Sequence, residues 1–190
     1  MDKFNGRYRI STTRLQNWDY GWNAPYFITI CTQNREHFFG EITNATMHLS
    51  KTGDLAQHYW NEIPKQFPYI ELGEFVVMPN HIHGIVIINK TTERRYAINR
   101  VSTSSTSPTN KSTIPGGKTG NKNPMLHDNL SRVIRWYKGR MTFECRKIEH
   151  GFLWQSRFYD HVIRDYGSYQ RIAEYIRNNP ANWQADKFFG

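Results

Sequence analysis

His81 and His83 are the residues whose types and spacing most directly suggest chemistry. They stand in FVVMPNHIHGIVII, residues 75–88, where two apolar stretches flank a short polar segment. Residues i and i+2 of a strand point to the same side, so the two imidazoles lie together while Ile82 points away. Neutral imidazole is the commonest metal-ligating side chain, and the pair could share one metal ion. The competing interpretation is two exposed sheet histidines without a ligand, because an HxH pattern is common by chance.

Two histidines do not complete a metal site, and a helix near the end of the chain offers further groups. Tyr175 and Asn179 are four residues apart and therefore share one helix face. If this helix crosses the open face of the sheet, Asn179 could supply an oxygen ligand and Tyr175 would lie over the ion. Two histidines and one oxygen leave coordination positions for a substrate phosphate. Tyr175 is otherwise an ordinary surface residue, since Ile172 and Ile176 are better core candidates.

A sheet must position these side chains, and four segments have the character of its main strands. They are rich in β-branched and aromatic residues and are bounded by turn residues. The four segments are residues 26–32, 71–78, 81–88 and 157–164. Pro79 and Asn80 form a turn between the second and third, since proline cannot donate to a central ladder and asparagine tolerates turn geometry. His81 therefore begins a returning strand.

Helical periodicity completes the pattern. Apolar residues recurring at helical spacing predict a helix from about 52 to 66 and a basic helix over 129–147. Ser168 could cap a last helix, which Pro180 helps to end. The order β-α-β-β-α-β is that of the ferredoxin-like split βαβ sandwich. We therefore expect an α+β fold, with a four-stranded antiparallel sheet, two helices on one face and an added C-terminal helix that carries the tyrosine.

The domain organisation follows from composition. We expect a single domain over residues 25–183, preceded by an arm at 1–24 and followed by a tail at 184–190. Residues 89–127 are rich in Ser, Thr, Gly, Pro and Lys and have almost nothing to bury. This segment is predicted to be a disordered loop that interrupts the domain.

Charge and cysteine content narrow the class of protein. The formal net charge of +9 is typical of a protein that binds a polyanion. The two cysteines are far apart and lack CxxC spacing, which argues against a disulfide scaffold and fits a reducing compartment. No segment approaches the roughly 18 to 20 apolar residues that span a bilayer. We expect a soluble cytoplasmic protein without a membrane partner.

Three motifs together carry a resemblance to a known family. MPNHIHG at 78–84, WQSRFYDHVIR at 154–164 and YIRNNPANW at 175–183 resemble the single-tyrosine HUH transposases, most of all the REP-associated tyrosine transposases. The resemblance runs from about residue 26 to residue 183 and omits the loop at 89–127. MPNHIHG followed by YIxxNP is specific as a pair and much less so singly.

The resemblance implies a catalytic role for the residues already singled out. The HUH pair falls on His81 and His83, the nucleophile on Tyr175, and the possible third metal ligand on Asn179, where related insertion-sequence transposases have a glutamine. It also implies a divalent ion, Mg²⁺ or Mn²⁺, of which the histidines favour Mn²⁺ somewhat. Of the three nearby tyrosines, Tyr159 and Tyr169 lack an amide four residues later. Tyr166 has Gln170 at that spacing but lies before or at the start of the predicted helix.

The implied reaction is cleavage and rejoining of single-stranded DNA at hairpin sites formed by palindromic repeats. The tyrosine would form a 5′-phosphotyrosine and release a 3′-OH, and a second 3′-OH could reverse the step, which is covalent catalysis. The resemblance implies a bacterial protein that associates with the nucleoid when bound to DNA. It leaves open whether the protein is a monomer or a homodimer, and the cognate DNA sequence is unspecified.

Several basic and aromatic residues are candidate DNA contacts. The helix over 129–147 and the start of the last helix could track a phosphate backbone through Arg132, Arg135, Lys138, Arg140 and Arg171. The same residues could equally form a solvated basic face. Trp18, Tyr20 and Trp22 of the arm could stack on unpaired bases or pack over the core.

Two other functions compete with a nuclease. A non-catalytic nucleic-acid-binding module could share the ferredoxin-like sheet, but RNA-recognition modules place aromatic residues on the central strands, where this chain has His81 and His83. A zinc hydrolase would need a carboxylate or a third histidine at close spacing, and none follows His83 nearby.

Overall fold

The structure is a computed structural model that describes residues 3–4, 7–8, 15, 18–90 and 127–189. Most of the segment expected as a loop at 89–127 lies outside the described residues, as does much of the arm at 1–24. Two short strands of that arm, β1 (Lys3–Phe4) and β2 (Arg7–Tyr8), pair antiparallel with each other.

Four strands form the central sheet, and each pairs antiparallel with its neighbours. They are β3 (Ala24–Cys31), β6 (Ile70–Val77), β7 (His81–Ile88) and β8 (Tyr159–Val162). Their order across the sheet is β6-β7-β3-β8, so the two middle strands are β7 and β3. This order, with its crossover helices, confirms the predicted ferredoxin-like α+β fold. A separate hairpin joins β4 (Gly40–Thr43) to β5 (Thr46–Leu49).

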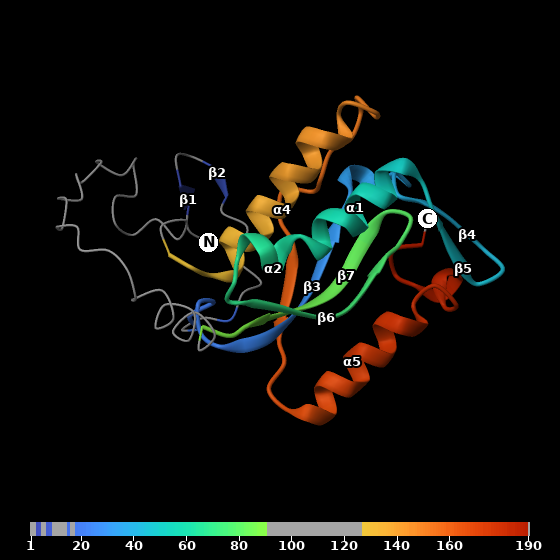
Figure 1. Cartoon of the computed structure of the whole chain (residues 1–190). Helices are drawn as coiled ribbons and strands as arrows, with labels where there is room; N and C mark the ends of the chain where they lie inside the picture. Colours follow the sequence, from blue (N-terminus) through green and yellow to red (C-terminus); the bar gives the residue numbers. More distant parts are fainter. Residues whose placement is uncertain (1–2, 5–6, 9–14, 16–17, 91–126, 190) are drawn as a thin grey trace, which may run out of the picture.

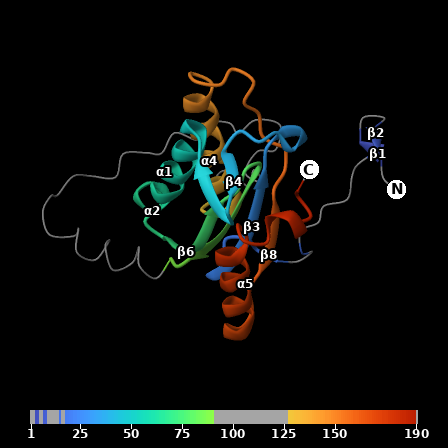
Figure 2. The same cartoon turned by 90° about the vertical axis from the view of Figure 1, so that its right-hand side faces the viewer.

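Helices cover both faces of the sheet (Figure 1). On one face lie α1 (Lys51–Asn61), α2 (Ile63–Gln66) and α4 (Leu130–Cys145). On the other lies α5 (Tyr166–Asn178), and the view turned by 90° shows α5 and α4 on opposite sides of the strands (Figure 2). The helix expected over 52–66 is split, because Pro64 at the first turn of α2 lacks the N–H that would continue α1.

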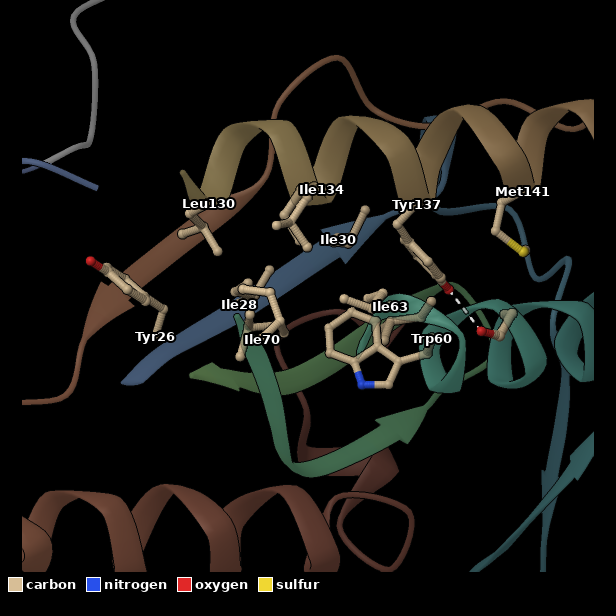
Figure 3. Packing of buried hydrophobic residues seen from close by; sticks show 14 of the residues in the cluster. Tyr26, Ile28, Ile30, Trp60, Ile63, Ile70, Leu130, Ile134, Tyr137 and Met141 are labelled. Carbon is tan, nitrogen blue, oxygen red and sulfur yellow. Dashed lines mark hydrogen bonds between the residues drawn. The ribbon is translucent and has the colours of Figure 1, made fainter. Parts of the chain in front are cut away.

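The main core lies between the sheet and the α1–α4 layer (Figure 3). The Tyr137 hydroxyl reaches across from α4 and donates to the carbonyl of Ala56 in α1 at 3.0 Å. Trp60 packs against β7 where the strand has Gly84, and a Cβ on that glycine would lie 2.2 Å from the indole. The glycine is therefore required for the close approach of the tryptophan to the strand.

A smaller apolar cluster fixes α5 on the opposite face of the sheet. It contains Ile85 of β7 together with Ile163, Ala173 and Ile176. The prediction that Ser168 caps this helix is wrong. Asp165 is the cap: its carboxylate accepts hydrogen bonds from the backbone N–H and the hydroxyl of Ser168, at 2.8 and 2.7 Å. The helix therefore begins at Tyr166, earlier than expected.

The aromatic residues of the arm are divided between the core and solvent. Trp18 and Tyr20 pack against the main core, and the indole of Trp18 donates to the Tyr26 hydroxyl at 3.2 Å. Trp22 remains 52% exposed. Within the described residues, no helix is long and apolar enough to cross a membrane.

Candidate active site

Strand β7 presents both histidines on the face of the sheet that α5 covers. His81 pairs with Cys31 and His83 with Thr29 in the register of β3. The intervening Ile82 belongs to the main core on the other face, as the strand alternation requires. The two imidazole rings lie 4.4 Å apart between centroids, and the residues are 0% and 1% exposed. The fold therefore buries this pair side by side.

His83 is held through both of its ring nitrogens. Its Nδ1 lies 2.8 Å from the hydroxyl of Thr29 on the neighbouring strand. Its Nε2 lies 3.2 Å from the hydroxyl of Tyr175, which α5 brings over the sheet. Tyr175 is 41% exposed. The structure thus brings the histidine and the tyrosine of the sequence analysis into direct contact.

His81 has one nitrogen occupied and the other without a partner. Its Nδ1 lies 2.8 Å from the side-chain oxygen of Asn80. Since the Asn80 amide nitrogen donates to the carbonyl of Phe188 at 2.9 Å, the Asn80 oxygen is the group that faces the ring. His81 therefore donates from Nδ1, and its Nε2 carries a lone pair. That atom is buried and has no hydrogen-bond partner among the described residues.

Asp186 is a member of the site that the sequence analysis missed. Its Oδ2 accepts hydrogen bonds from the Tyr175 hydroxyl at 3.2 Å and from the Asn179 amide nitrogen at 2.9 Å. The residue lies in the segment expected as a tail, 184–190, where no helical or strand pattern links it to the histidines. One feature of the sequence could have indicated it: Asp186 is the only carboxylate side chain that follows Tyr175 in the sequence.

The donor atoms fit a divalent cation. Ligand atoms of His81, His83 and Asp186 all lie within 4.8 Å of one another. The side-chain oxygen of Asn179 is buried and has no partner among the described residues, like Nε2 of His81. Buried polar atoms are rarely left unsatisfied. Two imidazoles with carboxylate and amide oxygens suit a borderline-hard ion such as Mn²⁺ better than a soft one.

Burial sets the protonation states of the site. Desolvation, and secondarily the neighbouring His83, lower the pKa of His81 to about 2. Desolvation also lowers the pKa of His83 to about 4, against an opposing contribution from Asp186. Both rings are therefore neutral at physiological pH, the form that binds metal. Desolvation and the nearby carboxylate of Asp186 raise the pKa of Tyr175 to about 12, so its phenol is protonated.

The segment that follows α5 covers the histidines. A 3-10 turn, η4 (Trp183–Ala185), leads into a stretch whose Phe188 ring lies 4.6 Å from the ring of His81. Trp183 lies 5.9 Å from the same ring. Arg35 donates to the carbonyl of Lys187 at 3.1 Å and lies over the Phe188 ring. The structure is therefore a closed form of the site.

The candidate DNA-binding residues divide between two faces. Arg132, Arg135, Lys138 and Arg140 lie on α4, on the opposite face of the sheet from Tyr175. Arg171 lies on α5 with Tyr175 and donates to the Ser168 hydroxyl at 2.8 Å.

The three competing tyrosines take other positions. Tyr166, in the first turn of α5, is 76% exposed. Tyr169 packs in the smaller apolar cluster. Tyr159 lies on β8 at the edge of the sheet, with its ring 6.3 Å from Phe27.

Comparison with known proteins gives a relative in sequence and a likeness in fold. No protein-family model matches the sequence. An uncharacterised protein of Haemophilus influenzae is 34% identical over 191 residues, which cover 98% of this chain and 97% of that protein. The solved structure of a REP-associated tyrosine transposase bound to a REP hairpin matches with a TM-score of 0.56 and 20% identity, over 94% of this chain and 77% of that one. This likeness confirms the expected resemblance at the level of the fold.

A second solved structure, of a protein from Deinococcus radiodurans R1, matches with a TM-score of 0.43 and 12% identity. It covers 88% of this chain and 97% of that one. A similarity of this size adds nothing to the assignment of the fold.

Proposed function

Because the chain belongs to the same family as the Haemophilus influenzae protein and shares the fold of the hairpin-bound transposase, we propose that it is a transposase-like nuclease and strand transferase. Its substrate is single-stranded DNA at hairpin sites, and Tyr175 is the nucleophile. The observation that carries this proposal is the distance of 3.2 Å between the Tyr175 hydroxyl and Nε2 of His83. A nucleophile beside a histidine pair that could hold a cation is suited to this chemistry.

The reaction needs one covalent step in each direction. The phenolic oxygen of Tyr175 attacks the phosphorus of a phosphodiester, and the bond from phosphorus to the 3′ oxygen breaks. The phenolic proton passes to Oδ2 of Asp186, which accepts a hydrogen bond from that hydroxyl, and the leaving 3′ oxygen takes up a proton. The 5′-phosphotyrosine keeps the phosphodiester energy, so a second 3′-OH can attack it and join a new strand.

His81, His83 and Asp186 would hold the divalent cation, with the Asn179 oxygen as a further donor. When bound, such a cation supplies positive charge that polarises a phosphodiester and stabilises the charge developed during attack. The protein's own contribution is to keep both histidines neutral through burial and to fix them through the contacts of Thr29 and Asn80.

DNA can reach the histidines only after the cover moves, because both rings are buried in the closed form. The cover beyond Asp186 is attached by the Asn80 and Arg35 hydrogen bonds to backbone carbonyls of Phe188 and Lys187 and by the packing of the Phe188 ring on His81. Exchange of these contacts for DNA contacts would open the site while Asp186 keeps its hydrogen bonds to Tyr175 and Asn179.

The test is transfer of label from DNA to protein. A pool of single-stranded hairpin oligonucleotides with randomised loops and flanks is incubated with the protein and Mn²⁺, then resolved on a denaturing gel. A 5′-phosphotyrosine predicts that 3′-labelled strands transfer label to the protein and that 5′-labelled strands do not. Excess EDTA should abolish the transfer.

Matched variants identify the nucleophile. Tyr175→Phe should abolish the adduct, whereas Tyr166→Phe, which removes an exposed hydroxyl from the same helix, should leave it unchanged. An adduct that persists in Tyr175→Phe would reject this assignment. The absence of any adduct from the wild-type protein, together with binding of the pool, would support the non-catalytic binding module instead.

A further inference from the structure

The outward side of α4 carries two hollows that the Tyr175 site does not use. The inward side of this helix packs on the sheet through residues such as Ile134 and Tyr137 (Figure 3). The first hollow, of about 570 Å³, includes Phe67, Trp136 and Phe143 in its lining. The second, of about 520 Å³, lies between α4 and the segment before β8. Both volumes fall within the roughly 300–1,000 Å³ typical of small-ligand pockets.

Both hollows are lined by cations and by no acidic residue among those that the structure describes. Arg132 and Arg140 line the first hollow and Lys138 and Arg146 the second, while Arg135 lines both. Arg132 and Arg140 are paired with acids on their own helix or beside it. Within the described part of the chain, Arg135 has no ion-pair partner. The surface therefore favours an anionic ligand that extends across both hollows.

Aromatic side chains accompany these cations. Phe143 is 60% exposed beside Arg140, whose guanidinium carbon lies 5.8 Å from the ring centroid. Trp154 and Phe158 line the second hollow. A protein can bind the phosphate backbone of a duplex with cations alone. Unpaired bases, in contrast, stack on aromatic side chains. The combination favours a single strand over a duplex.

Gly139 lines both hollows. It lies in the middle of α4, where glycine is less favourable than alanine. Apart from its chain neighbours and its own helix backbone, a Cβ at this position would meet no atom of the described residues within 4 Å. The fold itself therefore gives no reason for a glycine here, and an open helix backbone permits close approach by a ligand.

We propose that the outward side of α4 is a second DNA-binding surface, on which a single strand crosses Gly139 with a phosphate at Arg135 and bases in the two hollows. The choice of DNA rests on the proposed function. The second hollow lies next to the start of β8, the edge strand of the sheet. Phe158 lines that hollow, and the next residue, Tyr159, has its ring 6.3 Å from Phe27, which contacts the Tyr175 ring at 6.2 Å.

The test measures binding without cleavage. Fluorescence anisotropy with a 3′-labelled oligo(dT) in EDTA reports affinity whether or not Tyr175 forms an adduct, so failure of this inference is separable from failure of the proposed function. Gly139→Leu should weaken binding about tenfold or more, while the midpoint of urea unfolding stays equal or rises, because leucine is the better helix former. Gly139→Ala should weaken binding less and also stabilise the fold.

Arg135→Gln should reduce the slope of log affinity against log salt by about 0.7, the value for one phosphate contact on a single strand. Lys51→Gln, an exposed cation at the start of α1, is the matched control and should leave oligo(dT) affinity within about twofold of wild type. Wild-type oligo(dT) affinity in both Gly139→Leu and Arg135→Gln would overturn the proposal. A loss confined to a blunt duplex probe would overturn the choice of a single strand.

Discussion

The hydroxyl of Tyr175 lies 3.2 Å from Nε2 of His83, across 92 positions of sequence. The other nitrogen of the same ring lies 2.8 Å from the Thr29 hydroxyl. One imidazole is thus held between a residue of the adjacent strand and a residue of the helix above the sheet. The orientation of His83 depends on both contacts, and each contact can be removed by a separate substitution.

Thr29→Val should weaken Mn²⁺ binding about 10- to 100-fold, since the residue that orients a ligating histidine typically contributes this much. The stability loss should be only about 1 kcal/mol, the contribution of one hydrogen bond. Thr29→Ser restores the hydroxyl and should recover most of the affinity. Isothermal titration with Mn²⁺ measures the effect. Wild-type Mn²⁺ affinity in Thr29→Val would show that Thr29 does not position His83 for metal.

Asp186→Asn should lower both Mn²⁺ affinity and adduct formation, the latter by about 100-fold or more if the carboxylate takes the Tyr175 proton. The control is Glu174→Gln, which removes an exposed carboxylate adjacent to Tyr175 in sequence. Calorimetry and the gel assay separate the two roles. Loss of adduct with unchanged Mn²⁺ affinity would assign Asp186 to proton transfer alone, and wild-type values of both would show that Asp186 has neither role.

Stability of the metal-free protein should decrease in mild acid. The pKa of His83 falls from 6.5 to about 4 on folding and that of His81 to about 2. Between these values and 6.5 the unfolded chain binds more protons, so the free energy of unfolding falls as pH is lowered. The expected loss from pH 7 to pH 5 is about 2 kcal/mol per histidine, from 1.36 kcal/mol per unit.

Urea unfolding in EDTA at the two pH values measures this loss. The His81→Gln/His83→Gln double variant should lose most of the pH dependence, while His48→Gln, at an exposed position, should retain it. Equal stability of the wild-type protein at pH 5 and pH 7 would contradict the burial of the neutral pair.

Gly84→Ala should destabilise the fold by about 1–3 kcal/mol, the usual cost of overpacking a core. The added Cβ would lie 2.2 Å from the Trp60 indole. In a Trp60→Leu background the same substitution should cost less, and a double-mutant cycle measures the coupling. Gly151→Ala is the control, since its Cβ would meet only the Glu149 carboxylate at 3.5 Å. Additive effects at positions 60 and 84 would refute the steric explanation.

Phe188→Ala should loosen the cover and increase adduct formation several-fold, because the removed ring packs 4.6 Å from that of His81. Cys31 is buried beside this segment, and burial raises its pKa to about 11. Its alkylation should therefore accelerate in Phe188→Ala, whereas alkylation of Cys145 in the main core should not. Unchanged rates of both adduct formation and Cys31 alkylation would show that the cover does not limit access.

Local patterns were enough to predict the elements that carry the site. The strand His81–Ile88 was predicted to the residue, because Pro79 and Asn80 leave no other start for it. The cap of α5 was misplaced because Asp165 and Ser168 are both good capping residues, and only their mutual hydrogen bonds decide between them.

Contacts made by the chain after α5 could not be predicted from local sequence patterns. Asp186 meets Tyr175 and Asn179 only because the turn around residues 180–185 reverses the chain over the sheet. Phe188 likewise has no periodic partner in sequence, so nothing nearby in the chain indicated that it would cover His81. Such long-range contacts depend on the assembled sheet.

The two faces of strand β7 serve different functions. His81 and His83 face α5, whereas Ile82 and Gly84 face the main core. A slip of one residue in pairing would exchange these faces. It would place imidazoles against Trp60 and leave an isoleucine and a glycine beneath Tyr175. A single-residue insertion or deletion in this strand should therefore abolish the core and the site together.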